Sequence, residues 1–289
     1  MSAAGIALTA ALVAATQDQT GKPPVAPDSA LSRPQAPVTT QPAAQGSITT
    51  QPLVYRDGDI ELRGYLAYDK TSSGKRPGVL VVPEWWGLND FAKEKARQIA
   101  ALGYVALAVD MYGDGHVTSD PAEAGKLTGQ FREDLPRWRK RIQAAYDALA
   151  RDEHCDSKRI AAIGFCFGGS TVLQLAATGA DVAAVVSFHG GLMPYAEADG
   201  ARIKARILVL HGAADPHVPD ESVKAFEDSL RKTNVDWQII IYAGAKHGFM
   251  NPAAGRPGME GVSYDERTAR RAWSQMQAFL EEAFGATRP

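Results

Sequence analysis

Short apolar segments alternate with longer segments of helical period from Leu53 onward. The segments GVLVVPE and YVALAVDMYG are almost wholly apolar, which predicts buried central strands. The segments LVYRD and ELRGYLAY keep some period-two alternation and predict an edge pair of strands. Strands that alternate with helices are typical of a parallel sheet covered on both faces. We therefore expect an α/β fold within residues 51–287, with a mostly parallel central sheet and helices on both faces.

Capping and turn residues bound the predicted helices. Asn89 is a suitable cap for one helix, and Gly103 stops it. A second helical segment has Pro121 near its start, and Pro136 is expected to divide it in two. In the closing helix, one apolar stripe faces the sheet and consists of Ala269, Trp273, Met276 and Leu280.

The first residues form an apolar segment about as long as the core of a secretory signal. Residues 1–16 include small residues suited to cleavage, although the first cation is Lys22. We predict a signal peptide there and a periplasmic or secreted protein, or a cytoplasmic one if the segment is not a signal. A membrane span would need about 18 apolar residues and is not expected. Residues 17–50 are rich in Pro, Gln, Thr, Ala and Ser, which predicts a disordered linker.

Composition and charge narrow the classes of partner. With 289 residues and 45% hydrophobic composition, the chain can bury a sizeable core. Its formal net charge of −2 gives no electrostatic reason to expect nucleic acid or an anionic membrane as partner. We expect a small-molecule substrate and a monomer or homodimer.

The segment GFCFGG, centred on Cys166, follows a predicted strand and opens a predicted helix, as a nucleophile elbow requires. Its glycines allow a strained turn and a close approach of strand and helix. Because a helix N-terminus lowers the pKa of a thiol, we predict Cys166 as the nucleophile. The alternative is a small buried hydrophobic residue. Cys155 is not expected to pair with it, because the strand between them spans roughly 20 Å.

A catalytic triad on an α/β-hydrolase fold runs in the order nucleophile, acid, histidine along the chain. Asp215 follows the predicted strand RILVLHG, and His247 follows QIIIYAG, so both have the required position. We therefore predict Asp215 as the acid and His247 as the base. A lone Asp in a turn that contains Pro is otherwise only a turn residue. The histidines without the required position are His116, His154, His189, His211 and His217.

A metal site is the other reading of the histidines. His189, His211 and His217 would have to join Glu84, but no metal-ligand spacing such as HExxH occurs. Histidines at strand ends more often satisfy local hydrogen bonds. We predict neither a metal nor an organic cofactor.

An acyl-transfer site also needs hydrogen-bond donors for a developing oxyanion. The Phe167 N–H directly follows the nucleophile, and the second donor comes from the loop after an earlier strand, here PEWWG. We predict the Trp85 N–H as that donor. Glu84 beside it is hard to explain by packing, because an unpaired charge at a strand end is costly. Its charge partner is open, with candidates Arg202, Lys204, Arg206 and Lys246.

These residues together resemble the dienelactone hydrolase family, the carboxymethylenebutenolidases within the α/β-hydrolase superfamily. The resemblance runs from about residue 52 and rests on GFCFGG, PEWWGLND and KHGF. It implies that Cys166, His247 and Asp215 cleave an ester or lactone through a thioester acyl-enzyme. It also implies that Glu84 helps to deprotonate the thiol when substrate arrives.

The sequence departs from this family pattern at substrate recognition. Two arginines that bind the substrate carboxylate in the family would fall near Asp114 and Asn251, and neither is Arg here. An anionic lactone would lose its bidentate partners and meet a repelling aspartate. Trp86, Tyr112 and Phe249 are expected to rim a pocket for a neutral or aromatic ester.

Two other functions remain open at this stage. One is a peptidase, since oligopeptidases share the fold and the triad order, although they usually carry Ser at the elbow and an additional propeller or lid domain. The other is a non-catalytic α/β-hydrolase scaffold that binds a ligand or a partner. The intact triad pattern argues against the scaffold.

Overall fold

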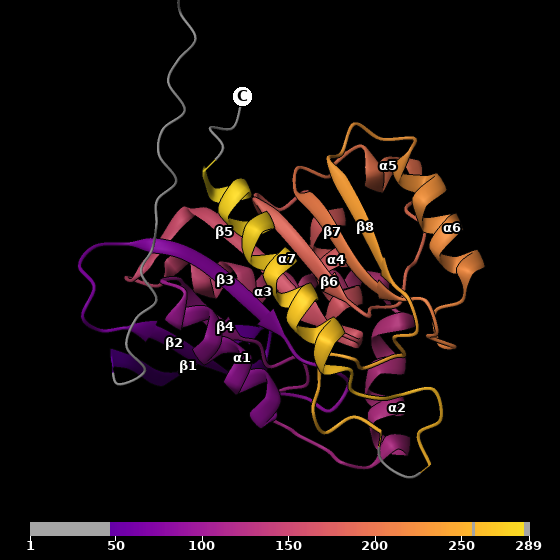
Figure 1. Cartoon of the computed structure of the whole chain (residues 1–289). Helices are drawn as coiled ribbons and strands as arrows, with labels where there is room; N and C mark the ends of the chain where they lie inside the picture. The colour runs from indigo at the N-terminus through magenta and orange to yellow at the C-terminus, as the bar shows by residue number, and fades with distance from the viewer. Residues whose placement is uncertain (1–46, 256–257, 286–289) are drawn as a thin grey trace, which may run out of the picture. The chain divides into compact units, whose positions relative to one another are not determined.

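An eight-stranded sheet forms the centre of the computed structural model, which describes residues 47–255 and 258–285 (Figure 1). Its order in space is β1-β2-β4-β3-β5-β6-β7-β8. Parallel pairing joins all neighbours from β4 to β8, so the predicted mostly parallel sheet is confirmed. The strands are β1 (Ile48–Asp57), β2 (Ile60–Asp69), β3 (Arg76–Val82), β4 (Val105–Ala108), β5 (Cys155–Phe165), β6 (Ala184–Phe188), β7 (Arg206–Gly212) and β8 (Trp237–Tyr242).

The two N-terminal strands form the expected edge pair. β1 and β2 pair antiparallel from Ile48↔Asp69 to Asp57↔Ile60, and β2 also pairs antiparallel with β4. The predicted linker to residue 50 is therefore too long, because β1 begins at Ile48. The Thr and Gln residues there resemble a linker in composition, but their backbone is paired with β2, a partner distant from the local pattern.

Helices cover both faces of the sheet, as predicted. On one face, α1 and α7 close a core that includes Ile99, Phe165 and Met276. On the other face, α3, α4 and α6 close a second core around Trp138, Val172 and Phe226. The helices are α1 (Asp90–Ala101), α2 (Pro121–Arg132), α3 (Leu135–Arg151), α4 (Phe167–Ala177), α5 (Glu197–Gly200), α6 (Asp220–Leu230) and α7 (Glu266–Gly285).

Helix ends follow the predicted signals. The Asn89 side chain accepts a hydrogen bond from the Ala92 N–H at 3.2 Å and caps α1. The long helical segment is divided as expected, with Pro136 in the first turn of α3. Of the predicted stripe in α7, three residues are buried, and Trp273 is partly exposed with Lys95 Nζ 4.7 Å above its ring.

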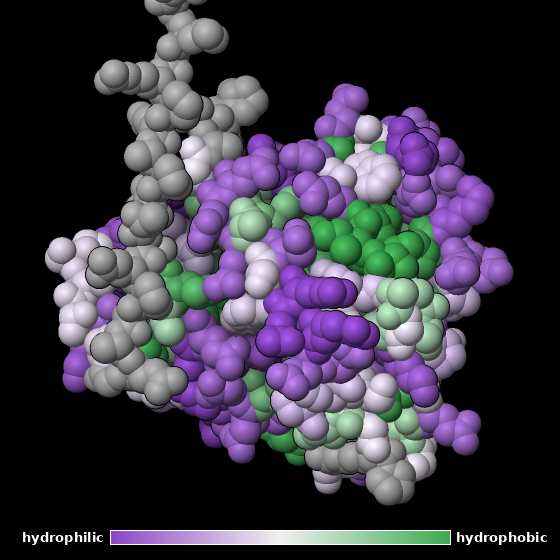
Figure 2. Space-filling model, viewed as in Figure 1, coloured by the Kyte–Doolittle hydropathy of each residue, from purple (hydrophilic) through white to green (hydrophobic). Residues whose placement is uncertain are grey.

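The two edges of the sheet differ in surface character. β8 is the edge strand at one end, and its Ile241 is 55% exposed. Figure 2 shows hydrophobic surface gathered over this strand. In the part of the chain that the structure describes, no helix combines the length and the apolar character needed to cross a membrane.

Candidate active site

Cys166 lies at a sharp junction between β5 and α4. Its backbone has a φ of 52°, a left-handed conformation that is strained for a residue with a side chain. A Cβ on Gly164 would lie 2.0 Å from the Gly168 carbonyl oxygen, and one on Gly168 would lie 2.2 Å from that of Val82. Only glycine fits these two positions, which allows the strand and the helix to approach and holds Cys166 at the apex. The strand, turn and helix expected of a nucleophile elbow are therefore present.

Asp215 and His247 form a buried pair beside this junction. Asp215 follows β7, His247 follows β8, and His247 Nδ1 lies 2.8 Å from Asp215 Oδ2. The other Asp215 oxygen accepts a hydrogen bond from the His217 N–H at 2.8 Å. Burial favours the protonated carboxyl, but the hydrogen bond and charge of His247 outweigh it and hold the pKa of Asp215 below its usual value. Asp215 is thus an ionised group that orients the imidazole.

The His247 ring faces the thiol of Cys166. Burial disfavours the imidazolium, but the charge of Cys166 and hydrogen bonds with Asp215 and Cys166 together raise the pKa of His247 to about 10. Since Nδ1 is engaged by Asp215, Nε2 is the atom left for the sulfur.

The two predicted oxyanion donors are the backbone N–H groups of Phe167 and Trp85. Phe167 is the first residue of α4, where a helix leaves its N–H groups unsatisfied. Trp85 lies in the turn after β3. Within residues 47–255 and 258–285, neither the Phe167 N–H nor the Trp85 N–H has a hydrogen-bond acceptor. Both are available to an oxyanion.

Glu84 is buried and is held by an amide. Its Oε2 accepts a hydrogen bond from Asn251 Nδ2 at 2.7 Å, and both residues are less than 9% exposed. The Asn251 amide therefore binds Glu84, and Asn251 also borders the cavity. Two of the cationic candidates pair elsewhere, Arg202 with Asp199 and Arg206 with Asp236. The other two, Lys204 and Lys246, are exposed.

A cavity of about 1170 Å³ opens above these groups. It is bordered by Cys166, His247, Glu84, Trp85, Trp86 and Phe167, all of which were predicted as site residues. Two predicted pocket residues do not border it. Phe249 is completely buried against His189 and Tyr242, so it is core. Tyr112 is not among the residues that border the cavity, and its hydroxyl donates a hydrogen bond to the Trp85 carbonyl oxygen at 2.7 Å.

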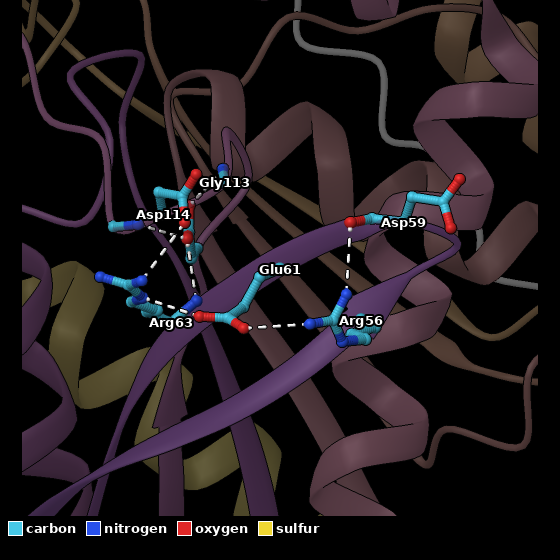
Figure 3. A network of polar contacts seen from close by, with 8 residues as sticks. Arg56, Asp59, Glu61, Arg63, Gly113 and Asp114 are labelled. Atoms are coloured by element: carbon cyan, nitrogen blue, oxygen red, sulfur yellow. Dashed lines mark hydrogen bonds and ion pairs between the residues drawn. The ribbon is translucent and has the colours of Figure 1, made fainter.

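The expectation that Asp114 repels an anionic substrate is wrong. Its side chain is 76% exposed and pairs with Arg63 on β2 at 3.4 Å (Figure 3). Asp114 is not among the residues that border the cavity. A positive φ at Asp114 and at Gly113 and Gly115 turns this loop outward.

His189 forms a contact with the elbow, and the sequence did not predict this contact. Its Nδ1 accepts a hydrogen bond from the Cys166 N–H at 3.1 Å, and its ring lies 5.2 Å from that of His247. Burial lowers the pKa of His189 well below its ordinary value, so the ring is neutral. Adjacent parallel strands could have revealed this contact, because Phe165 and Phe188 are register partners and the residues after them must meet.

The remaining histidines have separate roles. His116 lies 3.0 Å from Glu123, and His154 lies 3.0 Å from Asp152. His211 is buried, whereas His217 borders the cavity with its ring 5.2 Å from that of His247. Among the described residues, no three His, Cys, Asp or Glu side chains are grouped to hold a metal ion.

Two further sequence predictions concern the N-terminal segments and Cys155. The predicted signal peptide at 1–16, and all of the predicted linker except its last four residues, lie outside the described residues. Cys155 and Cys166 are both free thiols, and Cys155 is fully buried.

Comparison with known proteins identifies the family. The model of the dienelactone hydrolase family matches residues 62–284. Protein usf of Aquifex pyrophilus is 31% identical over 233 residues, which cover 79% of this chain and 96% of that protein. The crystal structure of a dienelactone hydrolase-like promiscuous phosphotriesterase from metagenomic libraries is 46% identical, with a TM-score of 0.81, and covers 83% of this chain and 100% of that chain. A structure named m3DLH is 43% identical with the same TM-score and coverage. The chain therefore belongs to the dienelactone hydrolase family, whose members are hydrolases of esters or lactones.

Proposed function

We propose that this protein hydrolyses a neutral carboxylic ester or lactone through a thioester on Cys166. The observation that carries the proposal is the pair of His247 and Asp215, 2.8 Å apart, whose free imidazole nitrogen faces the elbow thiol. All three residues come from loops at the carboxyl ends of parallel strands. This is the edge of an α/β sheet at which ligands bind.

The first half of the reaction acylates the enzyme. The Cys166 thiolate attacks the carbonyl carbon, an S–C bond forms, and the carbonyl π electrons move onto oxygen. The N–H groups of Trp85 and Phe167 hold this oxyanion. When it collapses, the C–O bond to the leaving group breaks, and the imidazolium of His247 gives its proton to the departing alkoxide or enolate.

The second half releases the acid. Neutral His247 takes a proton from water, and the hydroxide attacks the thioester carbonyl carbon. The tetrahedral oxyanion occupies the same two N–H groups. The C–S bond then breaks and returns the thiolate of Cys166, which pairs again with the imidazolium.

Two groups in the site are suited to accept the thiol proton. The raised pKa of His247 supports transfer to the imidazole, before substrate arrives. The family resemblance implies transfer to Glu84 when substrate is bound. The rate of alkylation of Cys166 by iodoacetamide in Glu84→Gln separates these routes, since an unchanged rate without substrate supports His247 as the acceptor.

The charges around the cavity support a neutral substrate. The described residues that border it include three carboxylates, Glu84, Asp90 and Glu260, and a single Lys or Arg, Arg132. A substrate with its own carboxylate would therefore meet an excess of negative groups. A cavity of about 1170 Å³ is also larger than a dienelactone requires and suits a bulkier ester.

Phosphotriesters are a second substrate class to test. A related structure with 46% identity is that of a promiscuous phosphotriesterase. In that case the thiolate would attack phosphorus, an S–P bond would form, and an aryloxide would leave. A neutral phosphotriester also matches the charge of the cavity wall.

The testing experiment compares two thiol variants of the full chain. Cys166→Ala and Cys155→Ala are assayed on a neutral p-nitrophenyl ester, a dienelactone and an aminoacyl p-nitroanilide. We expect the wild type and Cys155→Ala to hydrolyse the neutral ester, and Cys166→Ala to lose at least about a thousandfold in rate. Mass spectrometry of wild type quenched during turnover should show acylation of Cys166.

Other outcomes would change the proposal. Full activity of Cys166→Ala would overturn the thiol mechanism. Preferred cleavage of the anilide would indicate a peptidase, and a wild type inactive on all three would favour a ligand-binding scaffold.

Export and assembly are proposed separately. We propose that residues 1–16 are removed on export to the periplasm or on secretion, and that the protein is a monomer or homodimer. N-terminal sequencing of protein from the native host tests the first point, and sedimentation analysis tests the second.

A further inference from the structure

The oxyanion loop after β3 is held by its carbonyl groups. The Glu84 carbonyl oxygen accepts from the Gly87 N–H at 3.3 Å, and the Trp86 carbonyl oxygen accepts from the Thr118 N–H at 3.0 Å. The carbonyl between them, that of Trp85, accepts from the Tyr112 hydroxyl at 2.7 Å. This carbonyl is held by a side chain.

Holding these carbonyls fixes the direction of the donor N–H. In a trans peptide the C=O and the following N–H point in opposite directions. The Trp85 N–H shares a peptide plane with the Glu84 carbonyl, and the Trp85 carbonyl belongs to the next plane. The bonds from Gly87 and Tyr112 therefore fix both peptide planes that flank the Trp85 Cα.

Tyr112 is itself held rigidly. Asp110 is buried, and its Oδ1 accepts hydrogen bonds from the N–H groups of Tyr112 at 3.0 Å and Gly113 at 2.9 Å. Its Oδ2 accepts from the N–H groups of Gly115 at 2.8 Å and Arg63 at 2.9 Å. One carboxylate thus fastens the loop that carries Tyr112 to β2.

Surface contacts fasten the same loop from outside. The Asp114 N–H donates to the Glu61 carbonyl oxygen at 3.0 Å. The Asp114 carboxylate pairs with Arg63, which also pairs with Glu61 (Figure 3). Each of these exposed ion pairs contributes little to the free energy of folding, but together they restrict the loop between Tyr112 and β2.

The ring of Tyr112 also contacts the second oxyanion donor. It stacks on Phe167 with ring centroids 6.3 Å apart and an interplanar angle of 22°. On another side, Phe167 stacks on Trp138 at 5.2 Å. The side chain of the residue that supplies the N–H at the start of α4 is therefore confined by aromatic rings.

The hydroxyl of Tyr112 remains a donor across the working pH range. Burial raises its pKa above the ordinary value of a tyrosine, and the nearby charge of Cys166 raises it further. Tyr112 is not among the residues that border the cavity.

We propose that Tyr112 is a positioning residue that sets the geometry of the Trp85 N–H, one of the two predicted oxyanion donors, through the hydrogen bond of its hydroxyl to the Trp85 carbonyl oxygen. This inference rests on the proposed ester hydrolysis. Tyr112 acts through the backbone, and its contribution appears when negative charge develops on the substrate oxygen. It therefore affects kcat more than KM.

The test uses two Tyr→Phe variants of the full chain that lose the same kind of bond. Tyr112→Phe removes the hydroxyl that holds Trp85. Tyr195→Phe removes a hydroxyl that donates to the Leu173 carbonyl oxygen at 3.0 Å, away from the cavity. We expect Tyr112→Phe to lower kcat on a p-nitrophenyl ester by about tenfold or more with KM within twofold, and Tyr195→Phe to leave both unchanged.

Two reactions of Cys166 separate oxyanion stabilisation from thiol reactivity. A peptide aldehyde adds to the thiol and forms a hemithioacetal whose oxygen occupies the oxyanion site, whereas alkylation by iodoacetamide needs no oxyanion donor. Tyr112→Phe should weaken aldehyde binding by about tenfold and alter the alkylation rate less than twofold. Aldehyde binding is measured without turnover, so it tests Tyr112 even if the wild type cleaves no ester, an outcome that counts only against the proposed function.

Several results would overturn the inference. It is wrong if Tyr112→Phe keeps kcat and aldehyde affinity within twofold of wild type. It is also wrong if alkylation and aldehyde binding fall together, because the hydroxyl would then act on the thiol. If both variants lose stability and activity equally, the role of Tyr112 is only structural.

Discussion

The Asn251 amide lies 2.7 Å from the Glu84 carboxylate and joins two residues that are 167 positions apart in the chain. Glu84 lies two residues after the end of β3, and Asn251 lies in the loop after β8, four residues beyond His247. This hydrogen bond therefore connects the loop after β3 to the loop that carries His247.

Removing the Asn251 amide should destabilise the protein. Asn251→Ala deletes a hydrogen bond to a buried carboxylate, and we expect the free energy of unfolding to fall by about 1–3 kcal/mol. Urea denaturation measures it, with Asn234→Ala as the control because Asn234 is exposed. If the double variant Glu84→Gln/Asn251→Ala is no more stable than Asn251→Ala alone, the buried charge of Glu84 is not the cause.

Ionised Asp215 should make stability depend on pH in the acid range. Its pKa in the folded protein is held below the ordinary 3.8, so its ionisation stabilises the fold above pH 3.8. That contribution is lost as the pH falls through the folded-state pKa. The difference in unfolding free energy between wild type and Asp215→Asn should therefore be largest at neutral pH and shrink below 3.8. Urea denaturation across this range checks it, and a difference that grows with acidity would contradict it.

Two Gly→Ala variants should have opposite effects. A Cβ on Gly168 would lie 2.2 Å from the backbone oxygen of Val82, which cannot move without displacing β3. We expect Gly168→Ala to cost about 3 kcal/mol or more. Gly125 in α2 has no atom within 4 Å of an added Cβ, and Gly125→Ala should stabilise by about 0.5–1 kcal/mol. Thermal unfolding of both distinguishes steric conflict from a general effect of alanine.

Arg132 should favour anionic substrates modestly. It is the only Lys or Arg among the described residues that border the cavity, and it is exposed. Arg132→Met should lower kcat/KM for an ester that carries a carboxylate about two- to fivefold, because exposed charge pairs contribute about 0.2–1 kcal/mol. The rate on a neutral ester should not change. Lys126→Met on the same helix is the control, and an equal loss in both variants would exclude a specific contact.

Local sequence patterns were enough to predict the order of elements and to single out Cys166, Asp215 and His247 as candidate site residues. Apolar segments such as GVLVVPE are buried strands in any context that lets them pair. Glycines around Cys166 predicted the elbow because its close approach excludes a Cβ. The order of Asp215 and His247 along the chain placed them together, since parallel strands present their carboxyl ends at one edge.

Residues whose roles depend on a distant partner could not be assigned from the sequence. Phe249 and Tyr112 were expected at the pocket by composition, yet one is core and the other does not border the cavity, because aromatic side chains suit all these sites equally. The hydrogen bond between the Asn251 amide and Glu84 joins residues far apart in the chain, and no local pattern predicts it. The pattern of the chain by itself determined the fold and the sharp turn at Cys166, because backbone geometry and strand order are local or sequential. Tertiary structure alone decided which side chains meet across β3, β6 and β8, because packing between elements sets those distances.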